Sequence, residues 1–160
     1  MAEFSDLPLT YRLMMKAYRW RTISPTPWAS MRIPLAQSRV ALVTSAGLYR
    51  PGVDRDFGSR EGEDVTVRLL PRDTDVTTLA IGQTSNSFDR GAIERDRNLA
   101  LPLDRLRSLV DTREIGSIAP QHVSFNGSII APGRFVRDIA PQVADVLRAD
   151  EVDAVLFVPV

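Results

Sequence analysis

The chain of 160 residues holds 20 basic and 20 acidic residues, one histidine, no cysteine and 44% hydrophobic positions, which suits one domain. The lack of cysteine excludes disulfides and thiol nucleophiles within these residues, and His122 alone cannot build a multi-histidine metal site, so no metal is expected. Zero net charge argues against nucleic-acid or acidic-membrane partners, and no apolar run reaches the roughly 20 residues that span a bilayer, so we expect a soluble, cytoplasmic protein.

Residues 1–38 differ in composition from the remainder and are predicted to form a helix followed by a proline-rich arm. Apolar residues recur at helical spacing after Thr10, which we expect to cap a short amphipathic helix. The arm has net charge +3, so residues 39–160 carry −3. With its two tryptophans, the arm could bind a nucleic acid or an acidic partner, or it could pack on its own domain or on a second subunit.

From Arg39 onward, the pattern alternates between strands and helices. Short apolar or alternating runs predict strands over residues 40–44, 65–70, 78–81, 122–125 and 152–158. Residues 82–97 read as loop. Helices are expected from Pro102, with Gly116 as the C-terminal cap, and over 132–149, where Pro141 should kink or split the helix. The last strand is almost wholly apolar, which is typical of an inner strand. The fold class is therefore α/β, an open and mostly parallel sheet flanked by helices over residues 39–160.

Several polar residues lie where such a fold binds ligands. Thr44 and Ser45 end the first strand, so they should reach the carboxyl edge of the sheet, where a hydroxyl can bind a substrate carboxylate or cap a turn. Asp96 and Asn98 precede the Pro102 helix and could hold a substrate ammonium or carboxylate, or serve as caps. His122 is the one side chain that titrates near neutral pH, and it is either catalytic or a structural histidine.

About three-quarters of the chain resembles the N-terminal half of the selenoprotein B family of glycine, sarcosine and betaine reductases, with relatives in D-proline reductase. Four segments in order carry the resemblance: 39–47, 94–98, 101–110 followed by Ile115–Gly116, and 152–156. The resemblance adds Asp89 as a substrate-binding candidate, because relatives carry an aromatic residue followed by Asp there. They have Tyr where this chain has Phe88, so a hydroxyl role at that position is lost.

The resemblance implies a nucleophile directly after Val160. In the family, the strand matching 152–158 leads into a Sec/Cys-x-x-Cys motif, whose selenolate or thiolate attacks carbon and displaces an amine before thiols complete the reduction. The implied cofactors are thus selenocysteine or cysteine and a thiol reductant, neither within this chain. We expect residue 161 to be selenocysteine and the reading frame to have been ended at its UGA codon. Proteolytic processing and a deliberately chosen end are the alternatives.

The expected function is therefore a selenol- or thiol-dependent reductase acting on a small amine or amino acid, with the sheet incomplete at its C-terminus and this chain inactive alone. Partner subunits or a homo-oligomer would cover an incomplete sheet. The competing hypothesis is a non-catalytic α/β module for binding or subunit interaction that natively ends at Val160.

Overall fold

The computed structural model describes residues 7–18, 22–57, 64–83, 88, 90–129 and 131–160, and the chain divides into two compact units, Met1–Ser30 and Met31–Val160. This division lies earlier than the predicted arm boundary at Ser38. The reason is that residues just before the first strand already belong to the larger unit. Ser38 is buried, and its carbonyl accepts hydrogen bonds from the backbone N–H groups of Gly116 and Ser117.

The first unit contains helix α1, Leu9–Ala17. The expectation that Thr10 caps it was wrong, because Pro8 occupies the N-cap position and Thr10 lies within the first turn. The carbonyl of Pro8 accepts the first helical hydrogen bond, from the N–H of Arg12. The apolar side chains of α1 are largely exposed, and Trp28 in the same unit is 87% exposed.

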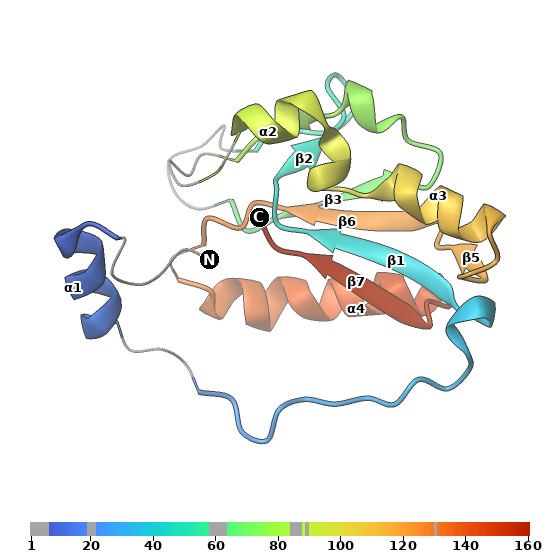
Figure 1. Cartoon of the computed structure of the whole chain (residues 1–160), viewed down its shortest axis with the longest axis horizontal. Coiled ribbons are helices and arrows are strands. Elements are labelled where there is room, and N and C mark those ends of the chain that lie inside the picture. The colour runs from blue at the N-terminus through green and yellow to red at the C-terminus, as the bar shows by residue number, and fades with distance from the viewer. Residues whose placement is uncertain (1–6, 19–21, 58–63, 84–87, 89, 130) are drawn as a thin grey trace. The chain divides into compact units, whose positions relative to one another are not determined.

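The second unit is built on a five-stranded sheet whose central strand is β1, Arg39–Thr44 (Figure 1). Parallel partners pair with β1 on both of its edges, and one antiparallel strand extends the sheet beyond β6. The partners are β5 (Ser117–Ile118) and β6 (Gln121–Phe125) on one edge, β7 (Ala154–Val158) on the other, and β3 (Val67–Pro71) beyond β6. A separate antiparallel pair is formed by β2 (Leu48–Tyr49) and β4 (Ala80–Ile81). The α/β class with a mostly parallel sheet is confirmed.

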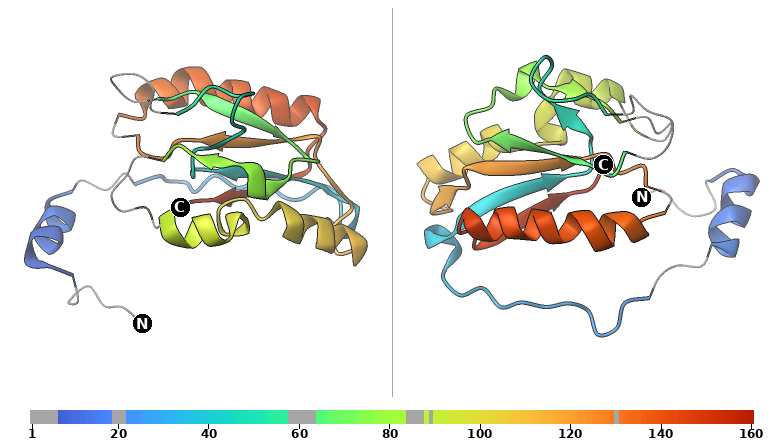
Figure 2. Two further views of the ribbon diagram at one scale, coloured as in Figure 1. Left: turned by 90° about the horizontal axis from the view of Figure 1, so that it is seen from above. Right: turned by 180° about the vertical axis from the view of Figure 1, so that it is seen from behind.

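Helices lie on both faces of this sheet (Figure 2). One face is covered by α2 (Arg90–Arg95) and α3 (Leu103–Asp111), and the other by α4 (Ala140–Ala149). Three-residue 3₁₀ helices occur at Leu35–Gln37, Val76–Thr78 and Arg97–Leu99. Within the described residues, no helix is long and apolar enough to cross a membrane.

Many of the fully buried side chains belong to one cluster on the α3 face of the sheet. Leu42 of β1 and Leu70 of β3 pack there against Leu101, Leu103 and other residues of one contiguous cluster. Helix α4 differs, since none of its residues, all of which the structure describes, is buried. The two faces of the sheet are therefore unequally covered.

The last strand departs from its predicted place. We expected the apolar run at 152–158 to be an inner strand, but β7 lies at an edge of the sheet and pairs with β1 alone among the described strands. Leu156 is 47% exposed and Phe157 69% exposed. A continuous apolar pattern reports hydrophobicity on both sides of a strand, and it does not report how many strands lie beside it.

The helical segments also required corrections. The predicted loop at 82–97 contains α2, a six-residue helix too short for a periodic pattern. Gly116 does not cap α3. That helix ends at Asp111, and Arg113 takes the left-handed conformation with φ of 61°. Gly116 is needed for a different reason, because a Cβ there would overlap the carbonyl group of Gln37.

Pro141 splits the segment 132–149, which confirms the predicted break. Residues Phe135–Ile139 form a π-helical stretch, and the α-helix starts at Ala140 with Pro141 in its first turn. Proline is tolerated there because the first N–H groups of a helix have no partner within it.

Candidate functional site at the carboxyl edge of the sheet

The candidate site lies where the parallel strands β1, β6 and β7 end at the same edge of the sheet (Figure 1). Thr44 closes β1 and faces Ser124 of β6 on one side and Val158 of β7 on the other. The position of Thr44 and Ser45 at this edge follows from the strand that precedes them. In open parallel sheets, ligands bind beyond the carboxyl ends of the strands.

Ser45 joins three segments at this edge. Its backbone N–H donates to the carbonyl of Val158 over 3.2 Å, and its own carbonyl accepts from the N–H of Gly127 over 2.9 Å. The side-chain amide of Gln83 donates to the same carbonyl over 3.3 Å. The Oγ of Ser45 accepts from the backbone N–H of Val160 over 2.9 Å and donates to the Val160 carbonyl over 3.2 Å. The hydroxyl predicted to bind substrate thus holds the backbone that follows β7.

Thr44 and Ser124 place buried hydroxyls beside Ser45. Both residues are fully buried, and the Thr44 hydroxyl accepts from the N–H of Ala46 over 3.2 Å, which turns the chain after β1. The Ser124 hydroxyl has no hydrogen-bond partner among the described residues. Asn126 is also buried, and its Oδ1 accepts from the N–H of Ser128. The edge therefore carries short polar side chains without an ionised group among these residues.

His122 is buried within the sheet and does not lie at this edge. Strand β5 pairs with the start of β1 and β6 with its end, which leaves the N–H of Leu42 in the gap between them. The His122 Nδ1 accepts from that N–H over 3.0 Å, so the imidazole replaces a missing ladder acceptor. Burial, and secondarily the positive charge of Arg107, lowers the pKa of His122 to about 4. The ring is neutral at pH 7, and this geometry favours a structural role.

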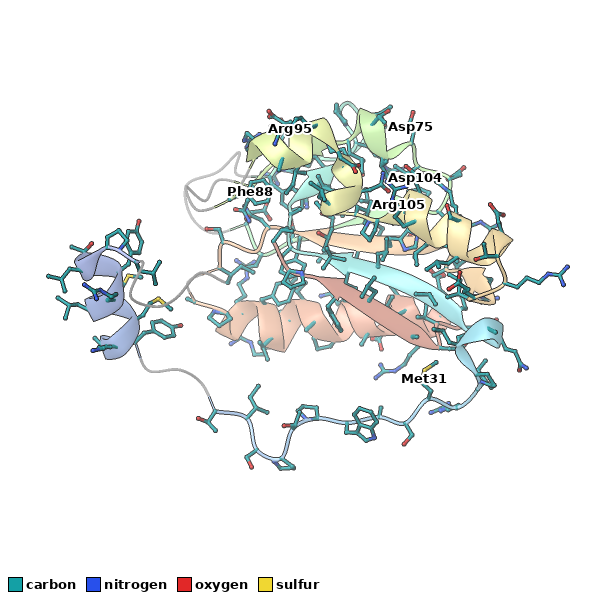
Figure 3. All side chains as sticks on the ribbon, viewed as in Figure 1. Met31, Asp75, Phe88, Arg95, Asp104 and Arg105 are labelled. Atoms are coloured by element: carbon teal, nitrogen blue, oxygen red, sulfur yellow. The ribbon has the colours of Figure 1, made fainter. Side chains whose placement is uncertain are left out.

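Asp96 caps the 3₁₀ helix Arg97–Leu99, and Asn98 holds the first turn of α3. The Asn98 Oδ1 accepts from the backbone N–H of Asp104 over 3.1 Å, and its Nδ2 donates to the Asp104 carboxylate over 2.9 Å. Asp96 accepts from the backbone N–H of Asn98, and this bond and the one from the Asn98 side chain lower the Asp96 pKa. Arg105 pairs with Asp96 over 3.9 Å; Figure 3 shows Asp104 and Arg105 at the beginning of α3. The hydrogen bonds of these two residues, which were predicted to bind substrate, thus cap the 3₁₀ helix and the first turn of α3.

Asp89, the fifth predicted substrate contact, lies outside the described residues. Its neighbour Phe88 is partly buried and packs against the hydrophobic core cluster. Among the residues that the structure describes, no three His, Asp or Glu side chains come together in a group that could hold a metal ion.

Sequence reasoning overlooked Gln83 and the close approach of Gly127. Gln83 is buried just beyond β4 and reaches the Ser45 carbonyl from a segment 38 positions away. A Cβ on Gly127 would lie 2.7 Å from the Ser45 Cβ. A glycine after a polar strand end is a signal for such an approach, but only the fold identifies the neighbour.

Comparisons with known proteins agree with the resemblance. The model of the family described as glycine/sarcosine/betaine reductase selenoprotein B matches residues 23–159. The D-proline reductase subunit gamma of Acetoanaerobium sticklandii is 30% identical over 154 residues, which cover 96% of this chain and 61% of the relative. The chain therefore spans about three-fifths of the length of this curated relative. No solved structure matches significantly.

Proposed function

Because this chain belongs to the glycine/sarcosine/betaine reductase selenoprotein B family, we propose that it forms the first part of a reductase that cleaves a C–N or similarly polarised bond in a small amine or amino acid. The relative's name identifies a subunit of D-proline reductase, which supports a substrate of this class. The chain supplies the sheet edge on which the reaction takes place, and a selenocysteine or cysteine in the polypeptide after Val160 supplies the nucleophile.

One observation carries this proposal. The segment after β7 is held by Ser45 at the carboxyl edge, beside the buried hydroxyls of Thr44 and Ser124. The resemblance expects the Sec/Cys-x-x-Cys motif directly after this segment. A nucleophile there would extend from the part of the sheet where α/β proteins bind their ligands.

The chemistry assigns separate tasks to the nucleophile and to this chain. A selenolate or thiolate attacks the substrate carbon and the C–N bond breaks with loss of the amine, which leaves a bond from selenium or sulfur to carbon. One thiol of a dithiol reductant attacks the selenium or sulfur and breaks this bond, so that the carbon takes up a proton. The second thiol then reduces the resulting selenium–sulfur or disulfide bond and releases the nucleophile, while the dithiol becomes a disulfide. The residues of this chain hold the backbone that leads to the nucleophile and exclude water with their buried neighbours. Asp89 is the proposed contact to substrate, because the Thr44 hydroxyl is buried and accepts from the N–H of Ala46.

The gene sequence and a thiol-dependent assay test the proposal. We expect a UGA or cysteine codon after Val160, followed by an open frame that encodes x-x-Cys and a further β/α unit. The continued polypeptide, with its partner subunits and a dithiol, should release amine from glycine, sarcosine or betaine, or open the ring of D-proline. The 160-residue chain is the matched control and should release none. An ordinary stop codon with no reading frame beyond it would contradict the proposal and favour a non-catalytic module.

The exposed surface around β7 supports association with another polypeptide. Leu156 and Phe157 present apolar side chains on opposite faces of the edge strand. An uncovered parallel edge of this kind invites a further strand or a subunit. We propose that the working enzyme is an assembly. The 160-residue chain should self-associate in light scattering, whereas a monomer at all concentrations would contradict this.

A further inference from the structure

The backbone of Ser45 forms hydrogen bonds on both sides of β1, with its N–H toward β7 and its carbonyl toward the residues after β6. The register pairs Thr44 with Val158, so the parallel pattern makes the N–H of Ser45 donate to the carbonyl of Val158, as it does. The next bond of the same ladder would run from the N–H of Val160 to the carbonyl of Ser45. That carbonyl instead faces the β6 side, where Gly127 and Gln83 donate to it. The ladder between β1 and the end of β7 therefore lacks its next backbone acceptor.

The Ser45 side chain supplies what the ladder lacks. A serine hydroxyl has one donor and two acceptor positions, and here it accepts from the N–H of Val160 and donates to the carbonyl of the same residue. Pro159, which separates β7 from Val160, has no backbone N–H and cannot donate a hydrogen bond to β1. Both hydrogen bonds between Ser45 and Val160 thus pass through one oxygen atom, the Ser45 Oγ.

Gly127 provides the space that this arrangement needs. A Cβ at position 127 would lie 2.7 Å from the Cβ of Ser45 and 3.1 Å from its Oγ. The N–H of Gly127 also holds the Ser45 carbonyl toward β6. Gly127 therefore turns the carbonyl away from β7 and leaves room for the hydroxyl to take its place.

We propose that Ser45 is a positioning residue that fixes the backbone of Val160 and so sets where the residue following β7 lies at the carboxyl edge. This rests on the proposed function for the identity of that following residue, but the anchoring of Val160 does not depend on it. Ser45 acts through the backbone and makes no contact with the substrate in this role. Its donor is already engaged with Val160, which distinguishes this role from the predicted carboxylate binding.

Backbone relaxation by NMR of the 160-residue chain tests the anchor directly. In the unmodified chain, we expect an order parameter for the Val160 amide near that of rigid backbone, about 0.85, and in Ser45→Ala a fall to below about 0.6. Ser108→Ala is the matched control, because it removes an exposed hydroxyl that bonds only within α3 and should leave Val160 unchanged. Gly127→Ala keeps the hydroxyl but displaces it, so it should also loosen Val160. An equally rigid Val160 in Ser45→Ala would overturn the proposal.

The continued polypeptide tests the consequence for catalysis. There, Ser45→Ala should lower kcat by about tenfold or more through a misplaced nucleophile, while KM stays within about twofold. A raised KM with unchanged kcat would overturn the positioning role in favour of substrate binding. If the unmodified continued polypeptide releases no amine, the proposed function fails, and the NMR comparison still decides whether Ser45 anchors Val160.

Discussion

The two faces of the central sheet differ in how completely they are covered. Under α3, Leu42, Leu70 and Leu103 are fully buried in one cluster, whereas no residue of α4, which covers the opposite face, reaches that state. Phe157 on the adjacent edge strand remains mostly exposed. We therefore expect most of the stability of this unit to come from the α3 face. The other face and the β7 edge are where another polypeptide would add burial.

The largest expected effect is on the α3 face. Leu103→Ala should lower the free energy of unfolding by about 2–5 kcal/mol, because it removes buried methyl groups and leaves a cavity beneath the first turn of α3. Phe157→Ala is the matched test on the other side and should cost less than about 1 kcal/mol in this chain. Denaturant unfolding of both variants measures the difference. Equal losses would show that the two faces contribute alike.

The second largest expected effect is a pH dependence of the free energy of unfolding, which comes from His122. The pKa of His122 is about 4 in the folded protein, below its unfolded value, so the neutral ring stabilises the fold above about pH 6.5. That contribution is lost as the pH falls toward 4, because the unfolded chain takes up the proton first. We expect a loss of about 2 kcal/mol between pH 7 and pH 5, measured by urea unfolding.

His122→Gln is the control for this pH dependence. Its amide oxygen can accept from the N–H of Leu42, but it does not titrate. The variant should be nearly flat between pH 7 and pH 5, a range in which carboxylates such as Asp96 remain ionised in both states. A slope as steep as that of the unmodified chain would assign the effect to other groups.

The smallest effect concerns the cap of α3. Asn98→Ala removes the acceptor for the N–H of Asp104 and should cost about 1 kcal/mol of unfolding free energy. Gln142→Ala, an exposed amide on α4, should stay within about 0.5 kcal/mol. Thermal unfolding of the two variants provides the comparison. If Asn98→Ala leaves stability unchanged, the side chain is free for the substrate contact first predicted for it.

Local pattern sufficed for much of the fold. The strand at 40–44, the helix after Pro102 and the break at Pro141 were readable because each depends on neighbours within a few positions. The short helix α2 and the edge position of β7 were not readable. The first is too brief to show periodicity, and the second depends on strand pairing between distant segments.

The candidate site was readable only in outline. Thr44 and Ser45 were expected at the carboxyl edge because they follow an apolar strand. The partners of Ser45 lie 38, 82 and 115 positions away, at Gln83, Gly127 and Val160. A polar residue in the sequence shows that it can donate or accept a hydrogen bond, and it does not show to which group. Because the sequence does not show these partners, Asp96, Asn98 and His122 were predicted as site residues, although the structure gives each of them a hydrogen bond within the fold.

By itself, the sequence determined the α/β class, the family and the order of strands and helices, because these depend on composition, periodicity and ordered motifs. Only the tertiary structure decided that His122 completes a strand pairing, that Asn98 caps α3 and that Ser45 holds the backbone after β7. The physical reason is that hydrogen bonds are short and directional. Their partners are chosen by which segments the folded sheet brings within about 3 Å.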